Sequence, residues 1–322
     1  MSMDLTGITN QNEYYTNHYL ASIFEENAGA TISAWRAEAK DNADVQTPWA
    51  KLRACSRQFY VLHNRYAETA AEHVRESVAE LAESYLNALS YPQPAPQLID
   101  LNDDLSVPVY LELTKSNGAP AVWILLSAST ESESTILSQY AFDAEKPESP
   151  FLPIENEKLI KQIFFAQNEP PRFVILIGMN QIALIDRNKW DRKAYLQFEL
   201  EDIFSRREET TLQAMSVLLH RDSICPESGM ILLDELDSNS QKHAAGVSQD
   251  LKYALRECIE LLGNEVLYSF RHNEGQYDPA EVDAGQLTLE CLRYMYRMLF
   301  GIVKKCAVGE YPKSWIGRSQ AA

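Results

Sequence analysis

The sequence lacks any long apolar run and any excess of positive charge. No stretch approaches the roughly 20 apolar residues that cross a bilayer, and the opening MSMDLTGITN lacks the basic start and apolar core of a signal peptide. We therefore expect a cytoplasmic protein. The net charge is −17 and the isoelectric point is near 4.8. Tight, independent binding of nucleic acid is not expected, because such binders present a basic surface.

Cysteine is also sparse. The chain has five cysteines, and none belongs to a Cys-x-x-Cys pair or stands near a histidine at ligand spacing. They are Cys55, Cys225, Cys258, Cys291 and Cys306. We expect no structural zinc and no disulfide bonds.

Glycine motifs that bind cofactors are missing. There is no Gly-x-Gly-x-x-Gly, no phosphate-binding Walker loop and no Gly-x-Ser-x-Gly elbow. The sequence NEPPRF at 168–173 differs from the Asn-Pro-Pro-Tyr loop of DNA adenine methyltransferases, because Asn168 is one place too early and Arg172 replaces the aromatic residue. We interpret the two prolines as a helix stop and predict no bound cofactor.

The front of the chain has helical periodicity. Residues 10–26 are predicted to form one helix, with Asn10 as its N-cap and Glu13 three residues later in a capping box. Residues 48–90 predict one long helix or two packed helices. Three prolines within YPQPAPQ (91–97) end this pattern and indicate a linker.

The middle of the chain changes to strand periodicity. A helix is expected at 155–167, and the acidic, serine-rich segment 128–153 is expected to be an exposed loop. The short connection near residue 180 predicts a hairpin. The expected strands are 107–114, 121–127, 172–179, 181–187 and a short edge strand at 194–200.

The back of the chain is helical again, at 201–219, 240–269 and 285–300. The last of these carries an apolar stripe at helical spacing: Leu289, Leu292, Met295, Tyr296, Leu299 and Phe300. We therefore predict an α+β fold with helices at both ends of a small mixed sheet. The expected parts are a helical region at 1–91, a mixed core at 98–200, a helical region at 201–303 and a short basic tail at 304–322.

The order strand, strand, helix, strand is that of PD-(D/E)XK nuclease cores. Those cores need a carboxylate and a lysine two positions apart, because such side chains share one strand face and converge on magnesium and its attacking water. Glu112 and Lys115 are three apart, which predicts opposite faces unless a β-bulge intervenes. If the chain is a nuclease, Asp100, Asp104, Glu112 and Lys115 would be catalytic and magnesium would be the cofactor. Otherwise we expect no metal site.

A group of basic residues surrounds Trp190, whose ring could stack on a base or sugar. The candidate nucleic-acid contacts are Arg187, Lys189, Trp190, Arg192, Lys193, Arg206 and Arg207. The alternative is a solvated end of a hairpin whose tryptophan fills the core.

Three stretches together resemble the amino-terminal region of large bacterial DNA adenine methyltransferases. They are LTGITNQNEYYTNHYLASIFE (5–25), the segment from RFVILIGM to SVLLH (172–220), and the segment from SQKHAAG to RYMYRMLF (240–300). The family is the type IIG restriction–modification class with its relatives in phage-defence islands. The resemblance implies that a methyltransferase domain, with S-adenosylmethionine as its cofactor, would follow this region. No methyltransferase motif occurs here, so no catalytic residue of that domain is carried over.

The leading hypothesis is a non-catalytic, nuclease-like scaffold that positions DNA or partner subunits in a restriction or defence assembly. The expected partners are methyltransferase or other defence-system subunits, with DNA contacted weakly and within a complex. The exposed part of the 285–300 stripe would be the docking face. Two alternatives stay open: an active magnesium-dependent endonuclease, and an acidic DNA mimic or regulatory interaction protein, which the net charge of −17 favours.

Overall fold

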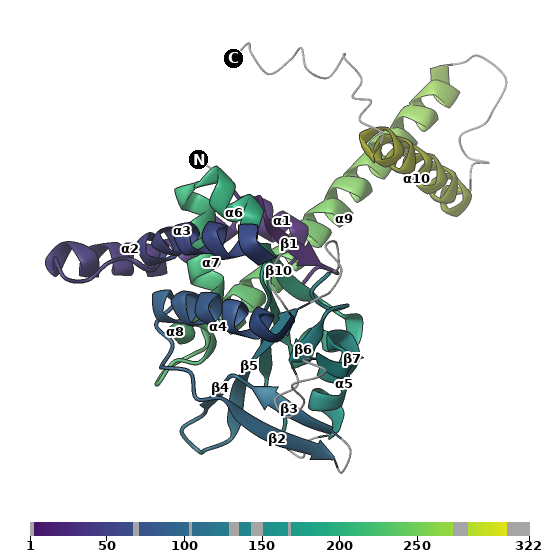
Figure 1. The fold of residues 1–322 in the computed structure, drawn as a ribbon. Coiled ribbons are helices and arrows are strands. Elements are labelled where there is room, and N and C mark those ends of the chain that lie inside the picture. The colour runs from purple at the N-terminus through teal and green to yellow at the C-terminus, as the bar shows by residue number, and fades with distance from the viewer. Residues whose placement is uncertain are drawn as a thin grey trace. The chain divides into compact units, whose positions relative to one another are not determined.

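The protein is an α+β structure with a mixed sheet at its centre and helices at both ends (Figure 1). The computed structural model describes residues 3–66, 71–102, 105–128, 135–142, 151–166, 169–272 and 283–307. The predicted fold class is therefore confirmed. Within these ranges, every helix is too short or too polar to cross a lipid bilayer.

The central sheet contains eight strands. In spatial order, seven of them are β1 (Ile8–Gln11), β10 (Tyr195–Glu199), β9 (Gln181–Asp186), β8 (Phe173–Ile177), β5 (Pro120–Ala128), β6 (Tyr140–Phe142) and β7 (Phe151–Glu155), and β4 (Leu111–Thr114) pairs with β5 beside β6. β5 and β8 are parallel, and the chain crosses between them through α5 (Asn156–Ala166). All other pairs are antiparallel. The predicted hairpin is β8–β9, and the apolar run at 121–127 is the buried central strand β5.

The two faces of the sheet carry separate hydrophobic clusters. Successive strand side chains point to opposite faces, so Val122, Ile124 and Leu126 join one cluster while Trp123 and Leu125 join the other. We call the first face the helical face. The helices that contribute buried residues to it are α1 (Asn17–Ser22), α2 (Phe24–Asp41), α3 (Pro48–Tyr66), α4 (Ala71–Ala88), α6 (Leu200–Arg206), α7 (Glu209–Leu219), α8 (Arg221–Ile224) and the start of α9 (Leu232–His272).

The opposite face, here called the α5 face, is covered by α5 and by a separate ribbon of two strands. The ribbon consists of β2 (Gln97–Asn102) and β3 (Leu105–Val109), which pair antiparallel. Its buried residues pack with those of α5 against β5, β8 and β9. The sheet is thus buried on both faces, which explains why β5 and β8 have continuous apolar sequences instead of an alternating pattern.

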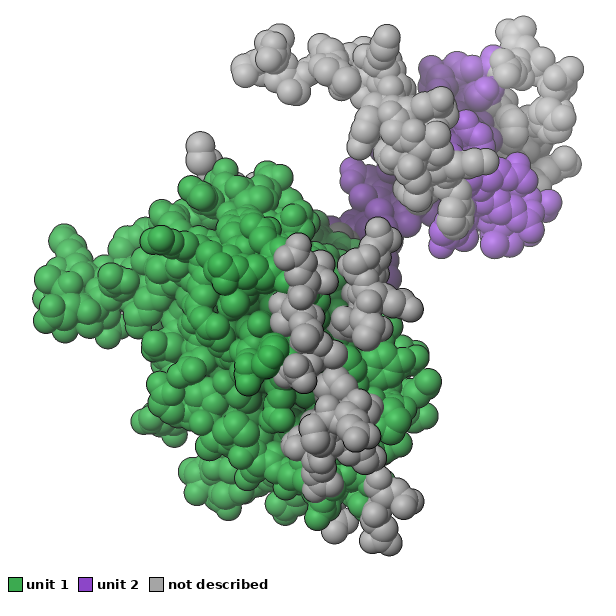
Figure 2. Space-filling view, in the orientation of Figure 1, with its two compact units in different colours: residues 1–242 green, residues 243–322 purple. Residues whose placement is uncertain are grey.

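Two compact units divide the chain (Figure 2). They are Met1–Lys242 and His243–Ala322, so the division falls within α9. The boundaries expected near residues 91 and 200 lie inside the first unit, because the helices before and after them contribute to one hydrophobic cluster. The second unit contains the rest of α9 and α10 (Ala284–Ala307). The predicted tail beyond residue 307 lies outside the described residues.

The predicted helix over 10–26 is wrong at its start. Residues 8–11 form β1, which pairs with β10, and the chain then turns through Asn12 and Glu13 at φ values of 49° and 55°. Asn10 caps no helix; its amide donates to the Tyr15 carbonyl oxygen (2.7 Å) and its oxygen accepts from the Tyr15 amide (3.1 Å). The pairing with a distant strand overrides the local capping pattern.

Other boundaries also differ from the prediction. β10 is an interior strand because β1 covers its outer edge, and the expected strand over 107–114 is divided at Tyr110 into β3 and β4. The segment 128–153 is not wholly an exposed loop, since Ile136 and Leu137 are buried beside β6; residues 129–134 and 143–150 lie outside the described residues. The helix expected at 201–219 is interrupted at Arg207, whose φ is 55°.

Candidate functional site

Glu112 and Lys115 lie on opposite faces of the sheet, as their spacing predicts. Glu112 stands opposite Trp123 on the α5 face, and Trp123 belongs to the cluster on that face. The β4–β5 register shifts between Leu113 and Thr114, which is the bulge that could have brought the two charged groups together. It does not do so, because Lys115 lines a cavity with Phe173 on the helical face.

The Glu112 carboxylate is engaged by neighbouring side chains. Its Oε1 accepts a hydrogen bond from the indole Nε1 of Trp123 at 2.8 Å, and its Oε2 accepts one from Nε2 of Gln97 at 2.7 Å. Trp123 is only 1% exposed, so its N–H has no access to bulk water. Glu112 therefore links β4, β5 and the β2–β3 ribbon on the α5 face.

The candidate acids before Glu112 do not complete a metal site in the described residues. Asp100 lies on β2, where its Oδ1 accepts from the Ser106 hydroxyl at 2.6 Å across the ribbon. Asp104 lies outside the described residues. Throughout the described ranges, no group of three or more His, Cys, Asp and Glu side chains is arranged to hold a metal ion.

Two of the seven candidate nucleic-acid contacts are buried. Trp190 is 7% exposed and packs edge-on against Phe164 in the α5-face cluster, so its ring cannot stack on a base in this fold. Lys189 is 6% exposed, and its ammonium is also enclosed. The prediction that Trp190 and Lys189 contact nucleic acid is therefore wrong, because both side chains are packed inside the protein. Arg187, Arg192 and Lys193 remain exposed on the 3₁₀ helix η1 (Arg187–Arg192) and directly after it.

The remaining basic candidates do not form one patch. The Lys193 carbonyl accepts from the Asn12 amide beyond the end of β1, whereas Arg206 pairs with Asp4 before its start (3.2 Å). The basic residues around η1 and those at the end of α6 therefore lie at opposite ends of β1. Lys193 is further paired with Glu157 at 2.5 Å. Arg207 follows Arg206 as an exposed residue at the end of α6.

A partly buried ionic cluster attaches the start of α9 to the sheet. The Arg172 guanidinium donates to Asp186 at 3.0 Å and to Asp234 of α9 at 2.8 Å. Burial lowers the pKa of Arg172, but the hydrogen bonds that it donates to Asp234 and Asp186 outweigh this effect and raise the pKa above its ordinary value. The arginine thus stays charged, and it satisfies the carboxylate of Asp186, which is 2% exposed.

Lys189 makes the second buried attachment of α9. Its Nζ donates to the Tyr14 carbonyl oxygen and to Asp237 Oδ1, each at 2.6 Å, and lies over the Tyr14 and Tyr15 rings at 4.0 and 4.5 Å. Burial lowers the pKa of this lysine, while Asp237 opposes that shift. The sequence contained no signal for either ionic cluster, because the partners are far apart along the chain.

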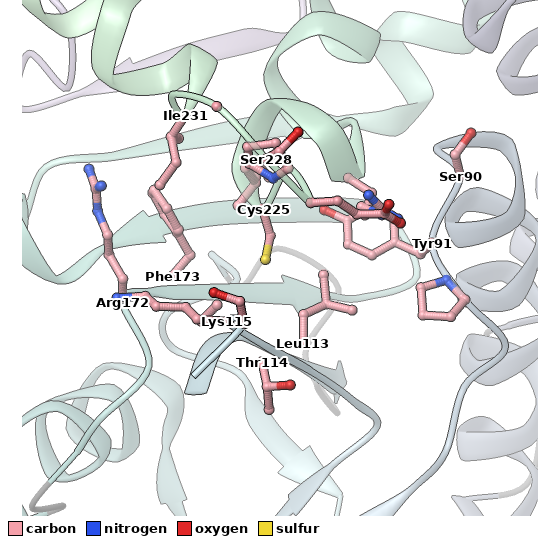
Figure 3. A pocket seen from close by; sticks show the side chains of 18 residues that line it. Ser90, Tyr91, Leu113, Thr114, Lys115, Arg172, Phe173, Cys225, Ser228 and Ile231 are labelled. Atoms are coloured by element: carbon pink, nitrogen blue, oxygen red, sulfur yellow. The ribbon is translucent and has the colours of Figure 1, made fainter. Parts of the chain in front are cut away.

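A cavity of about 780 Å³ opens on the helical face beside the β4–β5 turn (Figure 3). Its walls come from the loop after α4, the β4–β5 turn with the strand ends beside it, the start of β8, and α8 with the loop that follows it. Its lining includes Tyr91, Lys115, Phe173, Arg221, Cys225 and Glu227. Sequence reasoning missed this cavity, since four separate segments form it.

The cavity combines basic groups with a neutral thiol. Arg221 donates to Asp222 at 2.6 Å and to Glu227 at 2.7 Å. The Cys225 side chain lies among the lining residues in Figure 3. Burial raises the pKa of its thiol, although Arg221 and Lys115 act in the opposite direction. The thiol is therefore protonated at neutral pH and brings no negative charge to the cavity.

The second compact unit carries most of the exposed apolar side chains. Of the twelve large hydrophobic residues that are exposed in the described part of the chain, eight lie between Leu251 and Met298. A groove of about 760 Å³ runs between α9 and α10, and its apolar lining includes Leu255, Ile259, Leu267, Leu287, Cys291 and Leu292. In the predicted stripe, Leu289 and Tyr296 are exposed; the side chains of Leu299 and Phe300 lie outside the described residues.

Comparison with known proteins identifies no relative. No protein-family model matches the chain, and neither the curated proteins nor the solved structures contain a match.

Proposed function

We propose that this chain is a non-catalytic, nuclease-like scaffold in a restriction–modification or phage-defence assembly built around a DNA adenine methyltransferase. The position of Glu112 supports this most directly. Its carboxylate accepts from Trp123 and Gln97 on the α5 face, while Lys115 lines a cavity on the helical face. A PD-(D/E)XK nuclease requires this acid and this lysine to converge on one metal ion and its attacking water.

The arrangement of the core supports the nuclease-like part of the proposal. β4 and β5 form a hairpin, the chain continues through β6 and β7, and α5 then returns it to β8, which lies parallel to β5. Apart from the inserted β6 and β7, this is the strand, strand, helix, strand order of those nuclease cores. A shared arrangement does not carry a shared activity, because activity belongs to the residues of the site.

The pair of helices α9 and α10 supports the scaffold part. A pair of helices cannot bury all of its apolar side chains by itself, and here Leu251, Leu261 and Leu289 are each more than half exposed. We assign the exposed apolar side chains of these helices, among them Leu289 and Tyr296 of the predicted stripe, to contact with a helical segment of the methyltransferase subunit. An amphipathic helix that packs its apolar face against such a surface is a common mode of recognition.

Contact with DNA is assigned a secondary role. Arg187 and Arg192 are the exposed members of the basic group on η1, whereas Lys193 is paired with Glu157. Two arginines on a chain of net charge −17 position a duplex within a complex but do not hold it alone.

Cleavage of plasmid DNA tests the non-catalytic assignment. The purified chain is incubated with supercoiled plasmid and magnesium or manganese, beside the Glu112→Gln and Lys115→Met variants. We expect no nicking above the buffer control by any of the three proteins. Cleavage by the wild type that both variants abolish would establish the magnesium nuclease instead.

Association with a methyltransferase tests the docking assignment. A purified DNA adenine methyltransferase of the type IIG class is titrated against the full chain in analytical ultracentrifugation. Leu289→Glu is expected to weaken the complex by about tenfold or more, because a charge would be buried in an apolar contact. Phe165→Glu is the matched control, since Phe165 is 76% exposed on α5 in the first unit. Equal affinity of the wild type and Leu289→Glu would refute the docking face.

A further inference from the structure

The cavity beside the β4–β5 turn has the dimensions of a small-molecule site. Its volume of about 780 Å³ falls within the roughly 300–1,000 Å³ of typical ligand pockets. Part of its wall is apolar and consists of Tyr91, Leu113, Ile224 and Ile231. Such a wall with a few charged groups suits an organic anion better than a bare inorganic ion.

Lys115 supplies a positive charge at a defined place on the rim. Its backbone is held in the turn, because its N–H donates to the Ala119 carbonyl and its carbonyl accepts from the Gly118 N–H, both at 2.8 Å. Gly118 has a φ of +82°, a conformation that glycine adopts without strain. Among the described residues, no carboxylate lies within ion-pair distance of the Lys115 ammonium, so this charge is not neutralised by a neighbour.

Arg221 supplies the second positive charge. Its guanidinium forms a weak ion pair with the Glu227 carboxylate. The Arg221 amide donates to the Leu89 carbonyl at 3.1 Å, which fixes its backbone in the wall. One arm of the guanidinium binds Asp222, and the other binds Glu227 at 2.7 Å. The Glu227 side chain is 83% exposed, so solvent screens this ion pair and it contributes little.

Both positive charges line the same cavity as the Cys225 thiol. Lys115 and Arg221 each act electrostatically on Cys225, whose side chain lies among those that line the cavity (Figure 3). A ligand beside Cys225 would therefore lie within the field of both cations. A carboxylate offers two oxygens, whereas a phosphate monoester offers three strong acceptors and a charge near −2, and can engage a lysine and an arginine together.

We propose that this cavity binds a small organic phosphate of nucleoside monophosphate size, with its phosphate group between Lys115 and Arg221 in place of the Glu227 carboxylate. The apolar wall would take the organic part. This site goes beyond the scaffold role and does not depend on it, because its residues belong to the first compact unit alone.

Two variants with opposite expected effects on affinity test the proposal by isothermal titration calorimetry. The full chain is titrated with adenosine 5′-monophosphate, inorganic phosphate and a short single-stranded oligodeoxynucleotide. Lys115→Met is expected to weaken binding of the phosphate ligand by about tenfold, the effect of losing one charge-assisted hydrogen bond. Glu227→Gln is expected to strengthen it about two- to fivefold, because the competing carboxylate loses its charge.

Matched controls separate the site from the general charge of the protein. Lys40→Met and Glu25→Gln make the same charge changes at exposed positions of α2, outside the cavity, and are expected to leave the affinity unchanged. Thermal unfolding of each variant verifies that it is folded, and a gain of affinity by Glu227→Gln cannot arise from misfolding.

The three ligands distinguish the source of the phosphate. Binding of the nucleotide with this dependence on Lys115 and Glu227, and no such dependence for the oligonucleotide, establishes a free nucleotide as the ligand class. The same dependence for the oligonucleotide establishes a nucleic-acid phosphate. If none of the three ligands binds, or if the control variants change affinity as much as the cavity variants, the proposal is overturned.

Discussion

Replacement of Glu112 by alanine tests whether this carboxylate is a structural acceptor. The Trp123 indole N–H is buried and donates to Glu112 Oε1 at 2.8 Å. Without that acceptor the N–H would be left unsatisfied, which costs about 1–3 kcal/mol. Loss of the more exposed hydrogen bond from Gln97 adds about 0.5 kcal/mol. We therefore expect Glu112→Ala to lower the free energy of unfolding by about 1.5–3.5 kcal/mol.

A double-mutant cycle isolates the interaction with the indole. Trp123→Phe removes the donor while it keeps most of the ring, and the cost of Glu112→Ala should be smaller in that background. We expect a coupling energy of about 1–2 kcal/mol between the two positions, measured by urea unfolding with unchanged m-values. Glu112→Gln retains an acceptor for the indole and should cost about 1 kcal/mol or less.

An unchanged stability of Glu112→Ala would refute the role of Glu112 as a structural acceptor. Carboxylates held for a metal or substrate commonly reduce stability, so their removal is neutral or stabilising. If Glu112→Ala is as stable as the wild type and the coupling energy is zero, the carboxylate is not committed to Trp123. The scaffold proposal would then lose its main support, and cleavage assays would decide between the alternatives.

Three further predictions concern stability. Lys189→Met should lower the free energy of unfolding by about 2–4 kcal/mol in urea titrations, because the buried Tyr14 carbonyl and Asp237 lose their common partner; an unchanged midpoint would contradict this. Burial lowers the pKa of His220 to about 4. Above pH 6.5 this histidine is neutral in both states, and as the pH falls toward 4 only the unfolded state gains the proton, so stability should fall by about 3 kcal/mol. His220→Asn, which keeps a capping side chain, should reduce that dependence. Gly7→Ala should lower the melting temperature, because Gly7 has a φ of +85° and a Cβ would come within 2.7 Å of a neighbouring side chain.

The sequence alone determined the elements whose cause is local. The apolar run of β5, the short connection between β8 and β9, and the helical periods of α3, α4 and α5 all depend on residues close in the chain. The three-residue spacing of Glu112 and Lys115 is of the same kind, because side-chain direction along a strand follows from backbone geometry.

Tertiary structure alone decided the features that combine distant segments. β1 formed because β10 offered an open edge, although Asn10 and Glu13 have the spacing of a helix cap. Lys189 and Trp190 have the composition of a nucleic-acid contact, yet the packing of Tyr14 and α9 enclosed the lysine, and α5 enclosed the ring. The cavity near Lys115 is made by four segments and exists in none of them separately. The physical reason is the same in all three cases. The burial of a side chain depends on which elements pack together in the fold, and residue type and local spacing do not specify that packing.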